Sequence, residues 1–99
     1  MTRDIKTIDE LGEAKILQYL TLTSDQKQTE NTQHIIGGKE QTEFHGLAVC
    51  KYDNGAGVYL FYCDSDWNIL TDTWHETTED AQNQASFEFE NLEGKWIAK

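Results

Sequence analysis

The sequence predicts an α+β fold: an antiparallel sheet of three to four strands arranged as a meander, a C-terminal helix packed on one face, and a short N-terminal helix. Three segments rich in aromatic and β-branched residues, 44–52, 58–63 and 67–74, are separated by turn sequences, as the strands of a meander are. Helical spacing of small and apolar side chains follows at 78–90. A chain of 99 residues has the length of one domain with one core, so we expect residues 1–99 to form a single domain.

The segment 58–63 is predicted to be the central strand. Successive side chains of a strand point to opposite faces, and here both faces are apolar. One face carries Val58, Leu60 and Tyr62, and the other carries Tyr59, Phe61 and Cys63. A strand that is apolar on both faces is covered on both sides. The segment 67–74 is half polar, which is typical of an outer strand.

The helix over 78–90 has an N-cap at Thr77, whose side chain is expected to accept from the backbone of Asp80. Its apolar side chains form a narrow stripe suited to close packing on a sheet: Ala81, Ala85, Phe89 and Leu92. Phe87 points away from this stripe. It either packs sideways onto the sheet, which we favour, or is an exposed aromatic in an acidic surround. The tail 95–97 is expected to anchor against the sheet edge or its open face.

The N-terminal part begins with a capping-box pattern, in which Glu10 follows Thr7 by three residues. This pattern predicts a short helix over 8–15, covering part of the second face of the sheet. The following segment, 16–23, mixes β-branched, aromatic and leucine residues. It either continues the helix or forms a strand, and we favour the strand.

The segment 24–33 has no apolar residue at all. Such a segment cannot contribute to a core, so we expect an exposed, mobile loop there. The two isoleucines at 35–36, followed by glycines at 37–38, predict a brief strand that ends in a tight turn.

The charge is strongly segregated along the chain. Between Tyr52 and Gly94 there is no Lys or Arg, whereas the rest of the chain holds as many basic as acidic residues, so the whole net charge of −10 lies in one block. The acidic residues of this block are Asp53, Asp64, Asp66, Asp72, Glu76, Glu79, Asp80, Glu88, Glu90 and Glu93. Such a field attracts a basic partner and repels nucleic acid and anionic lipid, so we expect neither a nucleic-acid nor a membrane partner.

Compartment and cysteine chemistry follow from the same sequence. The first residues are charged rather than apolar, and no apolar run has the length of a membrane span, so we expect a cytoplasmic protein. Cys50 and Cys63 flank a turn sequence, and a hairpin would place them nearly opposite each other. They either form a disulfide or redox pair or remain reduced and pack as small apolar residues. Cytosolic chemistry favours the reduced form.

Metal and catalytic motifs are incomplete. Asp64, Asp66 and Asn68 match the start of a calcium loop, but Ile69 replaces the glycine and His75 the bidentate Glu, so a polar hairpin turn is favoured. His75-Glu76 starts like a zinc-protease signature, but position 79 is Glu and not the second His. The paired carboxylates are more typical of a solvated face than of an acid–base site. We therefore expect no enzyme, no metal and no cofactor.

The runs 59–64, 67–68, 71–75, 84–85 and 87–89 resemble a module of small acidic bacterial proteins of unassigned function. Some of those proteins are similar in size and charge to toxin-immunity proteins. The resemblance covers about residues 58–90, a third of the chain, and includes no established catalytic residue. It implies a bacterial origin, a compact fold of a strand meander and a helix, and an immunity-type role.

The remaining functional hypothesis is a protein-binding face in which aromatic anchors supply affinity and carboxylates select a basic partner. The aromatic residues of the block are Tyr59, Tyr62, Trp67, Trp74 and Phe87. We expect one strand end and one helix start to bring together a contact set: Asp64, Asp66, Trp67, Asp72, Glu76, Glu79 and Asp80. The favoured function is a non-enzymatic, immunity-type inhibitor of a basic bacterial effector. The alternative is a structural or housekeeping protein that self-associates, for example as a homodimer, and whose acidity only keeps it in solution.

Overall fold

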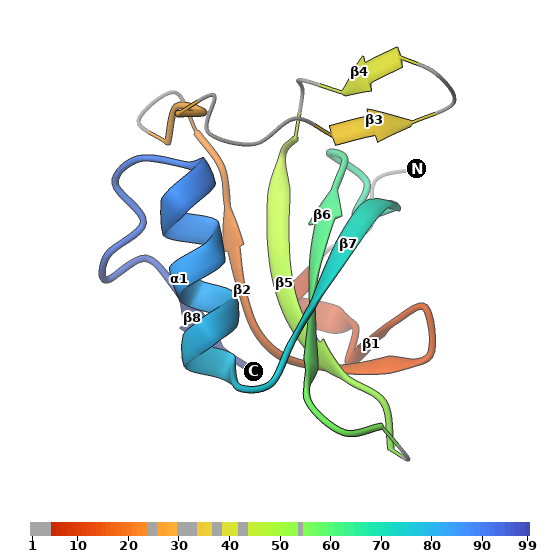
Figure 1. The fold of residues 1–99 in the computed structure, drawn as a ribbon. Coiled ribbons are helices and arrows are strands. Elements are labelled where there is room, and N and C mark those ends of the chain that lie inside the picture. Colours follow the sequence, from red (N-terminus) through yellow and green to blue (C-terminus); the bar gives the residue numbers. More distant parts are fainter. Residues whose placement is uncertain (1–4, 24–25, 30–33, 37–38, 42–43, 54) are drawn as a thin grey trace.

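The structure, a computed structural model, describes residues 5–23, 26–29, 34–36, 39–41, 44–53 and 55–99. It is an α+β fold in which a curled antiparallel sheet packs against one helix (Figure 1). In the described residues the main sheet has six strands: β1 (Glu10–Leu11), β2 (Ala14–Thr21), β5 (Gly46–Lys51), β6 (Val58–Cys63), β7 (Ile69–His75) and β8 (Ile97–Ala98). The helix is α1 (Thr78–Glu88), and a second small sheet pairs β3 (His34–Ile36) with β4 (Lys39–Gln41).

The strands follow the order β1-β2-β5-β6-β7, and β8 pairs with β2 as well. The meander β5–β6–β7 is confirmed, and β6 lies between two neighbours as its two apolar faces predicted. The expected three or four strands were too few. β2 pairs with β5 of the meander, and β1 and β8 both pair with β2. Since β5 occupies one edge of β2, β1 and β8 share its other edge.

The predicted helix over 8–15 is wrong. A single 3-10 turn spans Ile5–Thr7, and a hairpin follows in which Leu11 pairs with Ala14. The two residues between them, Gly12 and Glu13, have positive φ values of 53° and 70°. Two central residues in the left-handed region define the turn type that matches the twist of a two-residue hairpin. The strand favoured for 16–23 is confirmed as part of β2.

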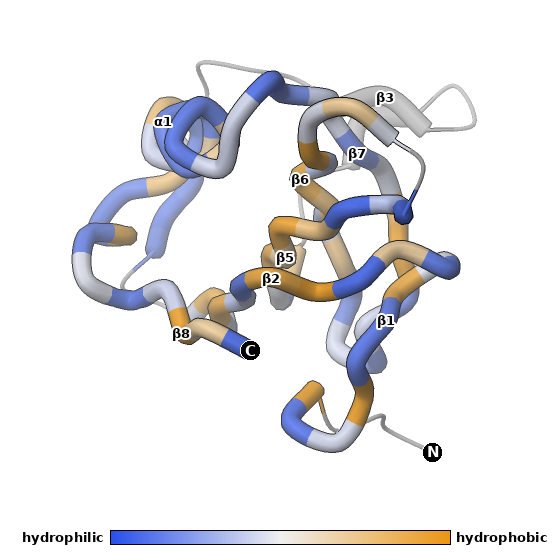
Figure 2. The backbone as a smooth tube through the Cα atoms, turned by 90° about the horizontal axis from the view of Figure 1, so that it is seen from below, coloured by the Kyte–Doolittle hydropathy of each residue, from blue (hydrophilic) through white to orange (hydrophobic). Residues whose placement is uncertain are grey.

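The sheet has an apolar cluster on each face. Figure 2 looks at the molecule from below and shows α1 set to one side of strands whose apolar residues lie mainly in the middle of the sheet. On the α1 side, the predicted helix stripe packs on the sheet: Ala81, Ala85, Phe89 and Leu92 against Leu20, Leu47, Val49, Val58, Leu60 and Tyr62. On the other side, Ile5 and Leu11 cover the central strands, so the N-terminal segment does cover the second face. The N-cap is also confirmed, because Thr77 accepts from the backbone N–H of Asp80.

Part of the segment 24–33 departs from the expected exposed loop. Gln26 is buried, and its side chain accepts from Thr23 and donates to the carbonyl of Asn91 at 3.2 Å. Gln28 forms a bridge with Phe89 beyond the helix. A polar side chain can be buried here because both its oxygen and its nitrogen have hydrogen-bond partners. Residues 24–25 and 30–33 lie outside the described residues, and so does the turn predicted at 37–38, although the strand before it is confirmed as β3.

The C-terminal tail is anchored to the sheet, whereas the side chain of Phe87 is exposed. The tail anchors at the sheet edge, where Ile97 pairs with Tyr19 of β2 and Trp96 packs against the cluster beneath α1. Phe87 does not pack onto the sheet: its side chain is 52% exposed. Within the described residues, none of the helices has the length and apolar character needed to span a bilayer.

Candidate protein-interaction surface

The surface around β7 collects most of the sequence-predicted contact residues. β7 is the last strand in the sheet order, and its register with β6 assigns its side chains to faces. Asp72 pairs with Phe61 and Trp74 with Tyr59, so both project from the face opposite α1. The side chains between them fall on the α1 side.

Trp74 is the exposed aromatic of this surface, and it is held in one orientation. Its side chain is 49% exposed, yet its indole Nε1 donates to the carbonyl of Ala56 at 2.9 Å. The ring lies against Gly57, where an added Cβ would be 2.7 Å from Trp74 Cζ2. Gly57 also has φ +78°, which favours glycine. The β5–β6 turn therefore packs against one side of the indole and holds it by a hydrogen bond, while the other side is exposed to solvent.

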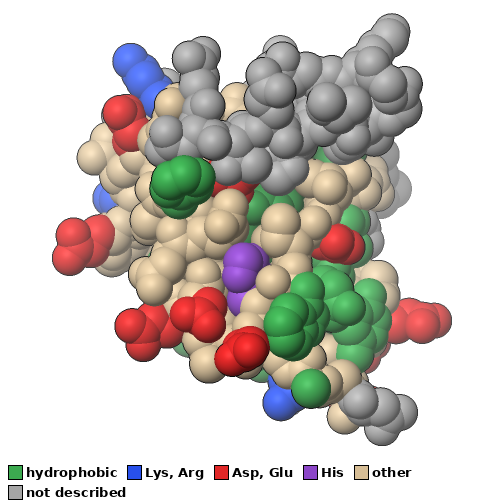
Figure 3. All heavy atoms as spheres, viewed as in Figure 1, with side chains coloured by type: hydrophobic (Ala, Val, Ile, Leu, Met, Phe, Trp, Pro, Cys, Tyr) green, Lys and Arg blue, Asp and Glu red, His purple; other side chains and the backbone are tan. Residues whose placement is uncertain are grey.

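Half-buried aromatic rings extend the apolar surface from Trp74 toward the core. The Tyr52 and Tyr59 rings meet edge to face at 5.4 Å, and Tyr59 stacks on Phe61 at 6.0 Å. Figure 3 shows an apolar cluster on this side of the molecule, with acidic side chains beside it. Trp74 is the cross-strand neighbour of Tyr59, so it stands beside these rings and is not an isolated aromatic.

Four exposed acidic side chains lie on β7 and on the chain that leads from it into α1. Asp72 is exposed on the strand, and Glu76 is exposed directly after it. Glu79 and Asp80 are exposed in the first turn of α1, where their charge complements the helix dipole. From here on, "the β7 surface" denotes Trp74 with Asp72, Glu76, Glu79 and Asp80.

Asp64 and Asp66 do not join this group. They lie in the β6–β7 turn, at the opposite end of β7, and seven residues of strand separate them from Glu76 by roughly 20 Å. The expectation that one strand end and one helix start unite the whole set is therefore wrong. Asp64 is also engaged in the turn, since its carboxylate accepts from the backbone N–H groups of Asp66 and Asn68, both at 2.9 Å.

Trp67 is a core residue and does not present its ring to a partner. It is 6% exposed and meets the ring of Tyr19 edge to face at 6.1 Å. Its φ of 62° bends the chain so that the indole folds back over Gly46, where an added Cβ would lie 2.6 Å from Cζ3. The sequence analysis named Trp74 among the aromatic residues of the acidic block but placed Trp67, and not Trp74, in the contact set. The signal that distinguishes them is position, because Trp67 lies in a tight turn and Trp74 on an edge strand.

Several polar side chains form hydrogen bonds on the α1 side of β6 and β7. The Thr73 hydroxyl and His75 Nε2 are 2.7 Å apart, and the Tyr62 hydroxyl donates to the buried carboxyl group of Glu88. Burial, with the Glu88 carboxyl next, raises the pKa of Tyr62 far above its ordinary value. Burial also lowers the pKa of His75, against the opposing pull of Asp80 and Glu88. These groups lie between the sheet and α1, and the Tyr62–Glu88 bond joins β6 to the last turn of the helix.

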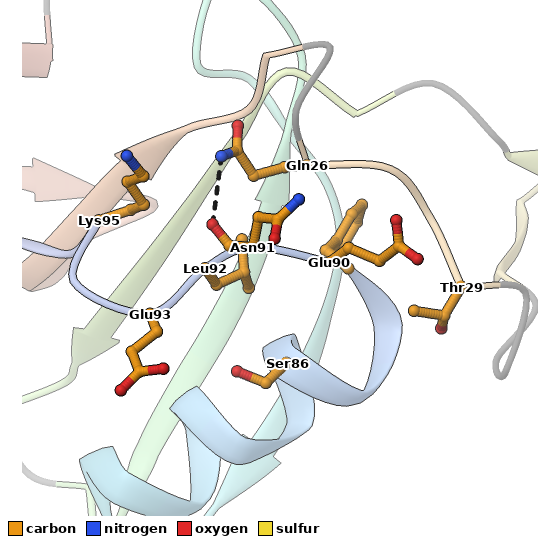
Figure 4. A pocket seen from close by; sticks show the side chains of 9 residues that line it. Gln26, Thr29, Ser86, Glu90, Asn91, Leu92, Glu93 and Lys95 are labelled. Carbon is orange, nitrogen blue, oxygen red and sulfur yellow. Dashed lines mark hydrogen bonds between the residues drawn. The ribbon is translucent and has the colours of Figure 1, made fainter.

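Two pockets lie elsewhere and have mixed polar and apolar linings. One pocket of about 570 Å³ opens beyond the end of α1, where Gln26 bonds to Asn91 between Ser86, Glu90, Glu93 and Lys95 (Figure 4). Another of about 680 Å³ lies between Asp9, Lys15, Asp53 and Lys99. In the part of the chain that the structure describes, no three His, Cys, Asp or Glu side chains gather as a metal site.

The two cysteines are buried, and neither is part of a disulfide. They are not opposite each other, because Cys50 pairs with Tyr59 and Cys63 with Gly46. Burial, with a smaller effect of Cys63, raises the pKa of Cys50 to about 12, so its thiol is protonated at neutral pH.

Comparison of the chain with protein-family models, with curated proteins and with solved structures gives no significant match.

Proposed function

We propose that this protein is a non-enzymatic binding module that docks the β7 surface on a basic protein partner. The observation that supports this most is Trp74, an indole that is 49% exposed, fixed by a hydrogen bond, and carried on a strand that also bears the exposed Asp72 and is followed by the exposed Glu76. A rigid aromatic side chain loses little entropy when it is buried by a partner, and for this reason tryptophan is enriched among the residues that dominate binding energy.

The charge around Trp74 supplies the choice of partner. Asp72, Glu76, Glu79 and Asp80 lie within the stretch of sequence that has no Lys or Arg. Exposed charges of one sign accelerate the encounter with an oppositely charged surface and disfavour acidic competitors. The indole then supplies the affinity that exposed ion pairs alone do not.

More specifically, the module acts as an immunity-type inhibitor of a basic bacterial effector and works by occlusion. The resemblance of residues 58–90 to small acidic bacterial proteins and the net charge of −10 support this assignment. An effector that acts on nucleic acid has a basic site, and spaced carboxylates can occupy the positions of phosphates there.

Charge reversal tests the proposal. We expect Glu76→Lys/Glu79→Lys/Asp80→Lys to lose a basic partner that the parent protein captures from its host lysate at low salt and releases along a salt gradient. The matched control is Glu10→Lys/Glu90→Lys/Glu93→Lys, which changes the net charge equally at exposed positions outside the β7 surface. The control should retain the partner, and circular dichroism checks that both variants are folded. Equal capture by both variants contradicts the proposal.

Trp74 has its own matched control. Trp74→Ala should weaken binding of the captured partner by at least about tenfold, the typical cost of truncating a central anchor. Phe87→Ala removes an aromatic ring of similar exposure from α1 and should leave the affinity unchanged.

Self-association is the second candidate, because an edge strand with an exposed indole can also pair with a second copy. Sedimentation separates the two functions. A stable dimer whose affinity does not change with salt, together with no basic partner, favours self-association.

A further inference from the structure

The outer edge of β7 is open in the described residues. β6 pairs with one edge of β7, and no described strand pairs with the other. The opposite margin of the sheet differs, because β1 and β8 both lie along β2. Every second residue of an edge strand turns its N–H and C=O outward, which provides a ladder for one more strand.

β7 also has only part of the usual protection of an edge. Its sequence, from Ile69 to His75, contains no Lys and no Pro, and four of its seven residues are β-branched or aromatic. The register shifts once, near its start, between the pairs of Tyr62 and Cys63. β3 comes near β7 without pairing with it. Figure 1 places β3 beside the end of β7 that follows β6, and in the other half of β7 the side chains of Asp72 and Trp74 are exposed.

We propose that the basic partner binds by strand addition: an extended segment with Lys or Arg at alternate positions pairs with the Asp72–His75 half of β7. This inference rests on the proposed function and specifies its geometry. Main-chain hydrogen bonds supply a sequence-independent part of the affinity, and alternate side chains supply the choice of segment.

The side chains of β7 define that choice. Asp72 and Trp74 project from the same face, so every second side chain of the added strand lies beside them. A cation fits both positions, as an ion pair with the carboxylate and over the face of the indole. Glu76 continues the acidic row at the end of the strand. On the α1 side, Thr73 and His75 favour small or β-branched neighbours.

Charge argues against a second copy as the occupant. Two chains of net charge −10 would bring Asp72, Glu76 and the acidic first turn of α1 close to the same groups of the partner copy. Like charges across a ladder destabilise the pair, whereas opposite charges stabilise it. The edge therefore fits a basic segment of another protein better than itself.

The test uses a synthetic peptide of seven residues in which lysine and valine alternate, acetylated at its start and amidated at its end. Two isomers carry N-methyl groups, one on the lysine amides and one on the valine amides. Only one of these sets of amides faces β7 in an added strand. Binding is followed by the amide signals of β7 in NMR titrations at low salt.

We expect one isomer to lose about tenfold or more in affinity and the other to bind within a few-fold of the parent peptide. Asp72→Asn/Glu76→Gln should weaken the parent peptide about threefold to tenfold, and the control Glu90→Gln/Glu93→Gln should not. These variants keep side-chain size, so a folded protein is expected in each case.

Three outcomes overturn strand addition. If both isomers bind like the parent peptide, docking is by side-chain charge alone, and the proposed function stands. If the parent peptide does not bind while the Lys variant at Glu76, Glu79 and Asp80 still loses the lysate partner, strand addition fails alone. If β7 amides are protected from exchange in a dimer that persists at high salt, the edge belongs to a second copy, and both proposals fail.

Discussion

The phenol of Tyr62 donates a hydrogen bond to the carboxyl group of Glu88 inside the core, between β6 and the last turn of α1. Both side chains are buried, and each comes from an element that otherwise contributes apolar contacts. A buried carboxyl group needs polar partners, so this bond fixes how α1 sits on the sheet.

Removing that hydroxyl should destabilise the fold. We expect Tyr62→Phe to lower the free energy of unfolding by about 1–3 kcal/mol, because Glu88 loses a buried hydrogen bond while the ring packing is kept. Urea denaturation measures the change. Tyr59→Phe is the control: Tyr59 is half-buried, and its hydroxyl makes no described hydrogen bond, so a change within about 0.5 kcal/mol is expected. Equal effects would show that the Tyr62 bond is not stabilising.

Gly46 should not tolerate a side chain while Trp67 is present. Gly46→Ala places a Cβ 2.6 Å from Cζ3 of the Trp67 ring, and overpacking of this kind costs about 1–3 kcal/mol. Trp67→Leu removes the clash but also removes a buried aromatic ring. The double variant should therefore be more stable than the sum of the two single effects predicts, as measured in a double-mutant cycle. Simple additivity would mean that the two residues do not meet.

His75 should make stability depend on pH. Its pKa is lowered in the folded protein, so between that value and about 6.5 the unfolded chain binds more protons than the folded one. Stability is then fully present above pH 6.5 and declines as the pH falls toward the folded pKa. His75→Gln should flatten this part of the profile in urea titrations between pH 7.5 and pH 5, relative to the parent protein. A profile that is unchanged by the substitution would contradict the assignment.

The thiols should react only after unfolding. Cys50 and Cys63 are buried, and the pKa of Cys50 is raised to about 12, so at pH 8 its thiol is both protonated and shielded. We expect no labelling by a thiol reagent over minutes in the native protein and complete labelling of both cysteines in urea. Rapid labelling of the native protein at pH 8 would show that the edge of the core opens more often than this packing predicts.

The sequence predicted correctly those parts of the fold that depend on residues close together in the chain. The alternation in 58–63 and the cap at Thr77 each depend on neighbouring residues, and both are confirmed. The hairpin turn at Gly12–Glu13 was not predicted, because a capping-box pattern precedes it and Gly-Glu is not a common hairpin turn. β8 has two residues and exists only because β2 offers an edge, which no local pattern reveals.

The candidate site was predicted in part for the same reason. Asp72, Glu76, Glu79 and Asp80 follow one another along a strand end and a helix start, so sequence proximity placed them together. The burial of Trp67 depends on a turn residue with φ 62° and on Gly46 across the sheet, which are tertiary features. The separation of Asp64 from Glu76 depends on strand length, because a seven-residue strand carries its two ends apart.

The two margins of the main sheet differ in strand length, and this difference limits the assemblies that the protein can form. Beyond β2, the strands β1 and β8 have two residues each, too few to template another molecule, whereas β7 has seven. In the main sheet of the described residues, β7 is therefore the edge that is long enough to pair with a further strand. Addition at both margins of one sheet, by which sheets grow into fibrils, is disfavoured because the margin beyond β2 is too short.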